Sequence, residues 1–151
     1  MKGEIFNFVL FSEIGTGTDV ADKRFYIDWN VLPESRYKLT FSFVSSTVPV
    51  ATTYEAMLFI NELGCSSNII CNGPYSNTGL NGGYIGILKD NVNEAYLASS
   101  INDNPPSFLK NKPATNQVNV KIHKNNLSLN NDNTPLPAKY TLVLSFEQLD
   151  E

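Results

Sequence analysis

The chain has 151 residues, a formal net charge of −4 and an isoelectric point near 4.9. This length suits one domain with a sizeable core, and charged residues make up only 17% of it, against a usual share of about 25%. The acidic balance and the lack of a Lys/Arg cluster argue against nucleic acid as a partner, because phosphate binding needs clustered basic side chains.

The N-terminal segment, MKGEIFNFVLF, contains an apolar run over residues 5–11. Glu4 and Asn7 interrupt its apolar character and no small-residue cleavage site follows, so we interpret it as a first β-strand. No apolar stretch approaches the roughly 20 residues that a membrane-spanning helix needs. We therefore expect a protein that is soluble, or assembled into something soluble, with no membrane span.

Alternation of apolar and polar residues is the dominant pattern further along the chain. In YKLTFSFV, residues 37–44, every second side chain is apolar, which predicts a strand with one buried face. QVNVKIH (117–123) and YTLVLSFE (140–147) repeat the pattern. Other candidates bring the set to about eight strands: Ile5–Phe11, Arg24–Trp29, Glu55–Asn61, Tyr84–Leu88 and, more weakly, Ala95–Ala98.

Clusters of Gly, Asn, Ser and Pro separate these segments, as is typical of turns. No segment shows sustained 3.6-residue periodicity, and a short helix around Asn91–Ser99 is the one helical alternative. About eight strands divided by turns predict an all-β fold. We expect a single-domain antiparallel β-sandwich, jelly-roll-like, that spans residues 1–151.

The stretch NDNPPSFLKNKP, residues 102–113, is either a linker between domains or a loop within one. One strong internal strand and one terminal strand follow it, and two strands do not make a sheet that is stable alone in water. We therefore interpret it as a loop. Pro105 and Pro106 stiffen its approach, so that Phe108 and Leu109 either anchor the loop under the sandwich or face a neighbouring subunit. These four residues form the candidate partner-contact site.

The catalytic inventory of the chain is short. Its one histidine, His123, falls on the polar side of its predicted strand, and no serine or cysteine motif serves it. The carboxylate pairs Glu55 with Glu62 and Asp90 with Glu94 could in principle hydrolyse glycosides on a jelly roll, but we interpret them as solvated surface acids. We expect no catalytic residue and no enzyme.

Metal and phosphate sites are equally weak in the sequence. Cys65 and Cys71 with His123 match no structural zinc spacing, and we favour two free thiols over a small disulfide loop. The loop at Asp90–Glu94 offers oxygen ligands for calcium, but not with EF-hand spacing. The glycines of Ile14–Asp19 lack the strand-turn-helix context of a phosphate loop and predict a hairpin turn. We expect no metal and no cofactor.

Five phrases of the sequence resemble a known family: YKLTFSFVSS, AMLFINELGCSSN, GYIGIL, NPPSFLKNKPATNQVNVKI and TPLPAKYTLVLSFEQLD. Together they are similar to minor capsid and other structural proteins of large icosahedral double-stranded DNA viruses, the chlorovirus group and its relatives. The resemblance covers about residues 37–150. Its most distinctive parts are the Asn-Pro-Pro run at 104–106 and the closing Pro-Leu-Pro-Ala-Lys-Tyr-Thr-Leu.

The resemblance implies a minor capsid, or cement, protein without enzymatic activity, found in the virion and assembled in the host cytoplasm. Its partners would be the major capsid protein and other minor capsid proteins, with self-association in the capsid also open. A surface rich in uncharged polar residues suits a subunit buried against neighbours, and the edges of an open sandwich can accept a strand from another chain.

The alternative function is a carbohydrate- or receptor-binding β-sandwich module. Carbohydrate recognition uses exposed aromatic side chains, and the sequence offers Trp29, Tyr54, Tyr75 and Tyr84. Trp29, however, lies at period two from the apolar residues before it, so we expect core packing for this residue.

Overall fold

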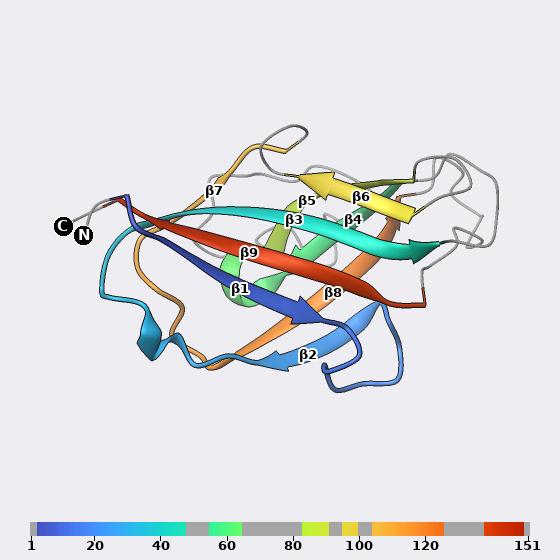
Figure 1. Cartoon of the computed structure of the whole chain (residues 1–151), viewed down its shortest axis with the longest axis horizontal. Coiled ribbons are helices and arrows are strands. Elements are labelled where there is room, and N and C mark those ends of the chain that lie inside the picture. Colours follow the sequence, from blue (N-terminus) through green and yellow to red (C-terminus); the bar gives the residue numbers. More distant parts are fainter. Residues whose placement is uncertain are drawn as a thin grey trace.

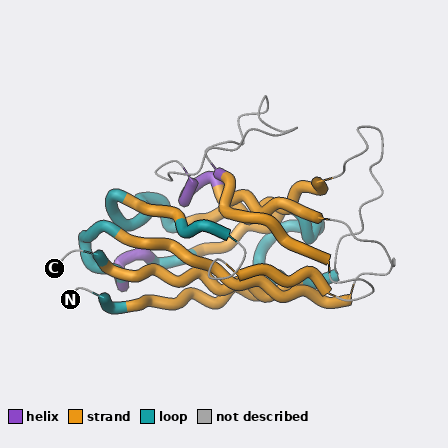
Figure 2. The backbone as a smooth tube through the Cα atoms, turned by 90° about the horizontal axis from the view of Figure 1, so that it is seen from above, coloured by secondary structure: helices purple, strands orange, loops and turns teal. Residues whose placement is uncertain are grey.

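The computed structural model describes residues 3–47, 55–64, 83–90, 95–99, 104–125 and 138–149. Most of this backbone is strand, and loops and two short helical turns make up the rest (Figure 2). The described elements are β1 (Ile5–Phe11), β2 (Asp22–Tyr26), the 3-10 turn η1 (Trp29–Val31), β3 (Tyr37–Thr47), β4 (Glu55–Ile60), the single turn α1 (Asn61–Gly64), β5 (Tyr84–Asp90), β6 (Ala95–Ser99), β7 (Ser107–Leu109), β8 (Gln117–Asn125) and β9 (Tyr140–Gln148).

Eight of the strands form two antiparallel sheets of four, in the orders β1-β9-β3-β6 and β2-β8-β4-β5 (Figure 1). Along the chain the strands switch between the sheets at almost every step, which is the jelly-roll arrangement of two Greek keys. A short ladder between β5 and β6 joins the two sheets, and β7 pairs with β3. The predicted all-β sandwich is confirmed.

The core lies between the two sheets and follows directly from the alternation. In β9 the inward side chains are Tyr140, Leu142, Leu144 and Phe146, all buried. The ring of Phe146 meets three other rings edge-on, those of Phe8, Trp29 and Tyr37, at centroid distances of 5.5, 5.4 and 6.0 Å. Edge-to-face pairs at such distances stabilise a core beyond the area that they bury.

The second predicted strand is shorter than the sequence indicates. We expected a strand over Arg24–Trp29, but β2 ends at Tyr26. Asp28 then caps η1 by accepting a hydrogen bond from the backbone N–H of Asn30 at 3.0 Å, which turns the chain. Trp29 is nevertheless buried, as its period-two position predicts.

The helical alternative around Asn91–Ser99 is wrong for residues 95–99, which form β6, whereas residues 91–94 lie outside the described residues. Antiparallel pairing of β6 with both β3 and β5 overrides any local helical tendency. No helix among the described residues is long and apolar enough to span a membrane.

Tyr140 carries a buried hydroxyl with no hydrogen-bond partner among the described residues. Its ring stacks on Phe43 at a centroid distance of 5.0 Å. Burial raises the pKa of Tyr140 well above its ordinary value of 10, because desolvation disfavours the phenolate. The folded chain therefore keeps a proton that the unfolded chain releases in alkali.

Tyr140→Phe should leave the free energy of unfolding unchanged at neutral pH, or raise it by about 1 kcal/mol, because it removes an unpaired buried group. In the native chain that free energy should fall as the pH rises above 10, since the folded state then binds more protons. Tyr140→Phe should reduce this fall, whereas the exposed Tyr26→Phe should not. Urea titrations followed by Trp29 fluorescence measure both effects, and a loss of stability at neutral pH would mean that the hydroxyl has a partner.

Candidate partner-contact surface

The candidate site lies on the Pro-rich loop, defined here as residues 104–113. The loop is fixed at its start by Asn104, which is only 6% exposed. The Oδ1 atom of Asn104 accepts a hydrogen bond from the N–H of Ile87 at 2.8 Å, and its Nδ2 donates to the Ile87 carbonyl at 3.2 Å. One amide side chain thus satisfies both backbone groups of a residue in β5.

Gly86 provides the space for this contact. A Cβ atom at Gly86 would lie 2.8 Å from Cγ of Asn104 and 2.7 Å from the ring of Phe41. Real Cβ atoms do not approach other atoms so closely, because the repulsion is too strong. Gly86, the second glycine of the GYIGIL phrase, therefore allows the loop to pack against β5.

The structure separates the two apolar residues of the loop. Pro105 is exposed and Pro106 partly buried, and β7 then pairs with the start of β3. Because side chains alternate along a strand, Leu109 points inward and joins the core, whereas Phe108 points outward and is 38% exposed. Leu109 is thus the anchor of the loop, and Phe108 is the residue that it presents to solvent.

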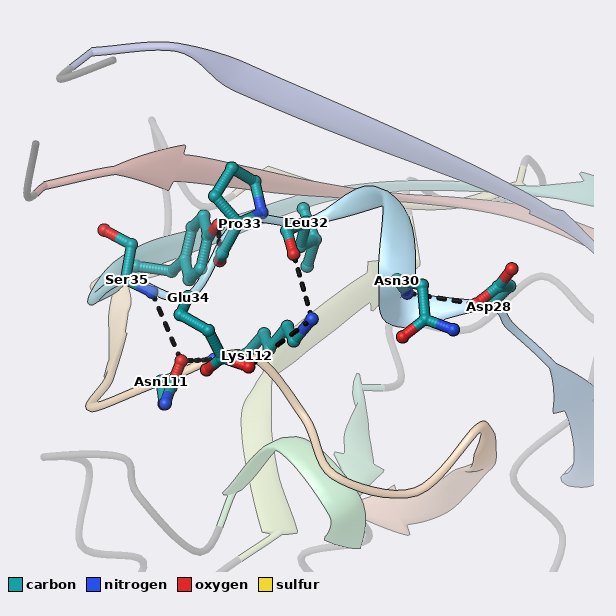
Figure 3. Close-up of polar contacts among 9 residues, drawn as sticks. Asp28, Asn30, Leu32, Pro33, Glu34, Ser35, Asn111 and Lys112 are labelled. Atoms are coloured by element: carbon teal, nitrogen blue, oxygen red, sulfur yellow. Dashed lines mark hydrogen bonds and ion pairs between the residues drawn. The ribbon is translucent and has the colours of Figure 1, made fainter.

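The end of the loop is bound to the segment after η1 (Figure 3). The Oδ1 atom of Asn111 accepts hydrogen bonds from the backbone N–H groups of Ser35 and Lys112, at 3.2 and 2.8 Å. The ammonium group of Lys112 donates to the carbonyl of Leu32 at 3.1 Å and lies 3.6 Å from Oε1 of Glu34. Two segments about 80 residues apart in the chain thus brace each other.

Trp29 ties the core to the residues that follow the loop. Its Nε1 donates to the carbonyl of Thr115 at 2.6 Å, and the N–H of Ile27 donates to the carbonyl of Asn116 at 2.9 Å. Trp29 is only 1% exposed and so offers no face to a sugar ring. Of the other aromatic candidates, Tyr84 is partly buried, and residues 54 and 75 lie outside the described residues.

Tyr37, the first residue of β3, contacts the segment between η1 and β3. Its hydroxyl donates to the carbonyl of Pro33 at 2.5 Å. Burial raises the pKa of Tyr37, and the carboxylates of Glu34 and Glu4 raise it further. The phenol, which is protonated at neutral pH in any case, therefore keeps donating further into the alkaline range.

Of the four acidic residues considered for catalysis, Glu62 is the one whose side chain the structure describes. Both carboxylate oxygens of Glu62, on α1, accept hydrogen bonds from Asn119. The backbone N of Asn119 lies 2.9 Å from Oε1, and its side-chain Nδ2 lies 2.6 Å from Oε2. This contact fastens α1 to β8, which is a structural role. Glu55 begins β4 and Asp90 ends β5, with side chains that are not described, and Glu94 lies outside the described residues.

The remaining chemical candidates are placed only in part. His123 lies in β8 opposite Met57 of β4, but its side chain is not described, and Cys65 and Cys71 lie outside the described residues. Within the described part of the chain, no three His, Cys, Asp or Glu residues come together as metal ligands. The glycine-rich Ile14–Asp19 segment forms a turn in which Gly17 has a φ of 113°.

A groove that the sequence did not indicate opens between the end of β1 and β2. Its volume is about 460 Å³ and its lining is mainly apolar. Phe11, Ile14 and Tyr26 line it and are 49%, 78% and 79% exposed. Alternation in the sequence places these residues in strands and turns but does not show that they line a groove. The one feature that could have indicated an apolar surface here is Ile14, an apolar residue at the start of a glycine-rich turn.

No protein-family model matches the sequence, and the comparisons with curated proteins and with solved structures give no match either.

Leu109→Ser should lower the free energy of unfolding by about 2–5 kcal/mol, the usual range for removing a buried leucine side chain. Phe108→Ser should lower it by less than about 1 kcal/mol, because that side chain is partly in solvent already. Urea titration of the two variants measures the difference. Equal losses would mean that Phe108 also anchors the loop.

Asn104→Ala should lower the free energy of unfolding by roughly 1–3 kcal/mol, since it leaves the N–H and carbonyl of Ile87 without partners. Asn30→Ala is the matched control, because Asn30 is exposed and its side chain makes no described hydrogen bond; it should change stability by less than about 0.5 kcal/mol. Thermal unfolding of both variants tests the contact, and a neutral Asn104→Ala would contradict it.

Proposed function

We propose that this chain is a minor capsid protein of a virion, which stabilises or spaces the capsomers of a major capsid protein through protein-protein contacts. The observation that carries the proposal is the braced loop that holds Phe108 partly exposed. A loop fixed before binding loses little conformational entropy when a partner covers it. Aromatic residues so presented are frequent anchors of interfaces.

The fold is compatible with this function but does not select it. Jelly rolls occur in viral capsid proteins, lectins and cupins, and a fold by itself implies no function. The sequence resemblance over residues 37–150 favours the capsid function among these.

The outer face of the first sheet gives further support. Val9 stands opposite Val143, and Phe11 and Val44 stand on either side of Thr141. Val9, Phe11 and Val44 are each 49% exposed, and Glu13 and Lys139 border this group beside Phe11 and Val44. Apolar residues gathered in this way on a surface often mark a contact with another protein.

The groove beside β2 favours the alternative function of a carbohydrate- or receptor-binding module. Tyr26 is highly exposed there, with Arg24 and Gln117 also in the lining. An exposed ring beside polar side chains suits the binding of a sugar. A glycan array with native chain and Tyr26→Ser tests this: saturable binding that the variant loses would favour the alternative.

The capsid proposal is tested on purified particles by quantitative peptide mapping during stepwise disassembly. The chain should be present and should leave the particle together with the capsomers. Its absence from particles, or its release with exterior fibres before the capsomers loosen, would overturn the proposal.

The contact residue is tested by two variants of the chain in the producing virus. Phe108→Ser should fold normally and fail to enter particles, because it removes the presented ring. Val31→Ser, at an apolar side chain that is 58% exposed on neighbouring η1, is the matched control and should be incorporated as usual. Normal incorporation of Phe108→Ser would exclude Phe108 as a contact.

A further inference from the structure

We infer that the free edge of β1 binds an extended segment of another protein as an additional strand, and that this segment has apolar residues at alternate positions and basic residues at both ends. The inference rests on the proposed function in one respect, since it names the chemistry of a partner for an assembly protein.

The hydrogen bonds to β9 show which backbone groups of β1 are free. The N–H of Gln148 donates to the carbonyl of Glu4 at 2.8 Å, and the N–H of Ser12 donates to the carbonyl of Tyr140 at 3.0 Å. In an antiparallel ladder the backbone groups of successive residues point alternately to the two sides. The backbone groups of the even-numbered residues of β1 therefore face β9, and those of the odd-numbered ones, Ile5, Asn7, Val9 and Phe11, face away from it. Among these outward groups, the carbonyl of Phe11 accepts a hydrogen bond from the N–H of Ile14 at 2.9 Å, so the edge is free from Ile5 to the N–H of Phe11. No described strand pairs with that side.

β1 also lacks the features that normally prevent edge pairing. Its seven residues contain no charged residue and no proline, and its register with β9 is continuous. Edge strands of natural proteins usually carry such charges, prolines or bulges. As far as the described part of the chain shows, the edge of β1 from Ile5 to Val9 is therefore open to an added strand.

The edge strand of the other sheet shows the contrast. β2 contains Asp22, Lys23 and Arg24 within five residues. The backbone of Arg24 is further covered by Thr16, which exchanges two hydrogen bonds with it, at 2.8 and 3.0 Å. The edge strand β2 thus carries charged residues and a backbone bridge to Thr16, whereas the edge strand β1 has no charged residue and no described bridge on its outer side.

The side chains of β1 set the pattern of the incoming segment. On the outer face Ile5, Val9 and Phe11 are about half exposed, and on the inner face Phe6 and Phe8 are only partly buried. A neighbouring strand would cover both rows, which favours apolar residues in it. The groove of about 460 Å³ adjoins the end of β1 and offers room for one of its side chains.

The charges at the ends of β1 favour basic residues there and oppose a second copy of this chain. Glu4 precedes the strand and has no described ion pair, and Glu13 follows it, 4.0 Å from Lys139 in an exposed and therefore weak pair. Two copies of β1 aligned antiparallel over their full length would bring Glu4 of each close to Glu13 of the other. Basic residues on the incoming segment would instead meet a carboxylate at each end, in either strand direction.

The test uses the full chain and a synthetic peptide, Lys-Thr-Val-Thr-Val-Thr-Val-Thr-Lys, with a second peptide in which both Lys are Glu. Titration followed by NMR should give saturable binding of the first peptide and binding that is roughly tenfold weaker, or weaker still, for the second. Amide hydrogen exchange should become slower at Ile5, Asn7, Val9 and Phe11, while the amides that already face β9 change little. Binding of neither peptide, or equal binding of both, would overturn the inference.

Variants of β1 locate the binding on its edge. Val9→Pro removes an N–H that the fold does not use, and Val9→Lys places a charge on the edge; each should reduce binding at least tenfold. Val31→Lys is the control for an added charge, since Val31 is 58% exposed on η1, outside β1 and outside the lining of the groove, and it should bind as the native chain does. Should Val9→Pro not fold, Val9→Lys alone decides, and undiminished binding by it would overturn the inference.

Self-pairing is a separate outcome. Protection of the odd-numbered amides that grows with protein concentration and needs no peptide would mean that a second copy occupies the edge, which contradicts the inferred partner. These measurements use no particles. Lack of peptide binding would therefore not contradict the capsid proposal. Absence of the chain from particles would likewise not contradict the binding of a strand at the edge of β1.

Discussion

The packing of Trp29 is the interaction on which the rest of the structure depends. Its ring meets those of Phe8 and Phe146 at 5.0 and 5.4 Å, which joins η1 to the first sheet. Its Nε1 holds the carbonyl of Thr115, just beyond the Pro-rich loop. A buried indole that spends its one donor in this way couples the core to a surface loop. The residues that follow the loop are therefore held by the core, while the pairing of β7 with β3 sets the exposure of Phe108.

The strands were largely predictable because alternation is local. Ile5–Phe11 was predicted with the bounds that β1 has, and Tyr37 and Tyr140 were predicted as the first residues of β3 and β9. Burial of one face dictates this pattern whatever the strand pairs with. The partners of each strand were not predictable, because β9 would fit beside many strands on its pattern alone and only the tertiary fold places it between β1 and β3.

The candidate site was predictable only as a segment. The prolines identified the loop, but the sequence did not show that Phe108 is exposed and Leu109 buried. That difference arises because residues 107–109 form a strand with β3, and three residues are too few to show alternation in the sequence. The docking of Asn104 depends on Gly86, about 18 residues earlier, and on the ring of Phe41. The open edge of β1 was likewise hidden, because an edge strand and an inner strand of one sheet share the same alternation.

The positions of the two surfaces bear on what the chain can do. β7, which carries Phe108, flanks β3 on the side away from β9, whereas β1 flanks β9 on the other side. At about 4.8 Å between neighbouring strands, three intervals set them roughly 14 Å apart across one sheet. If both proposed contacts form, two partners would be held at once, one by a side chain on a braced loop and one by backbone hydrogen bonds along an edge. Because both contacts belong to the same rigid sheet, the distance between the partners is fixed by the fold, and a protein that spaces its neighbours needs that property.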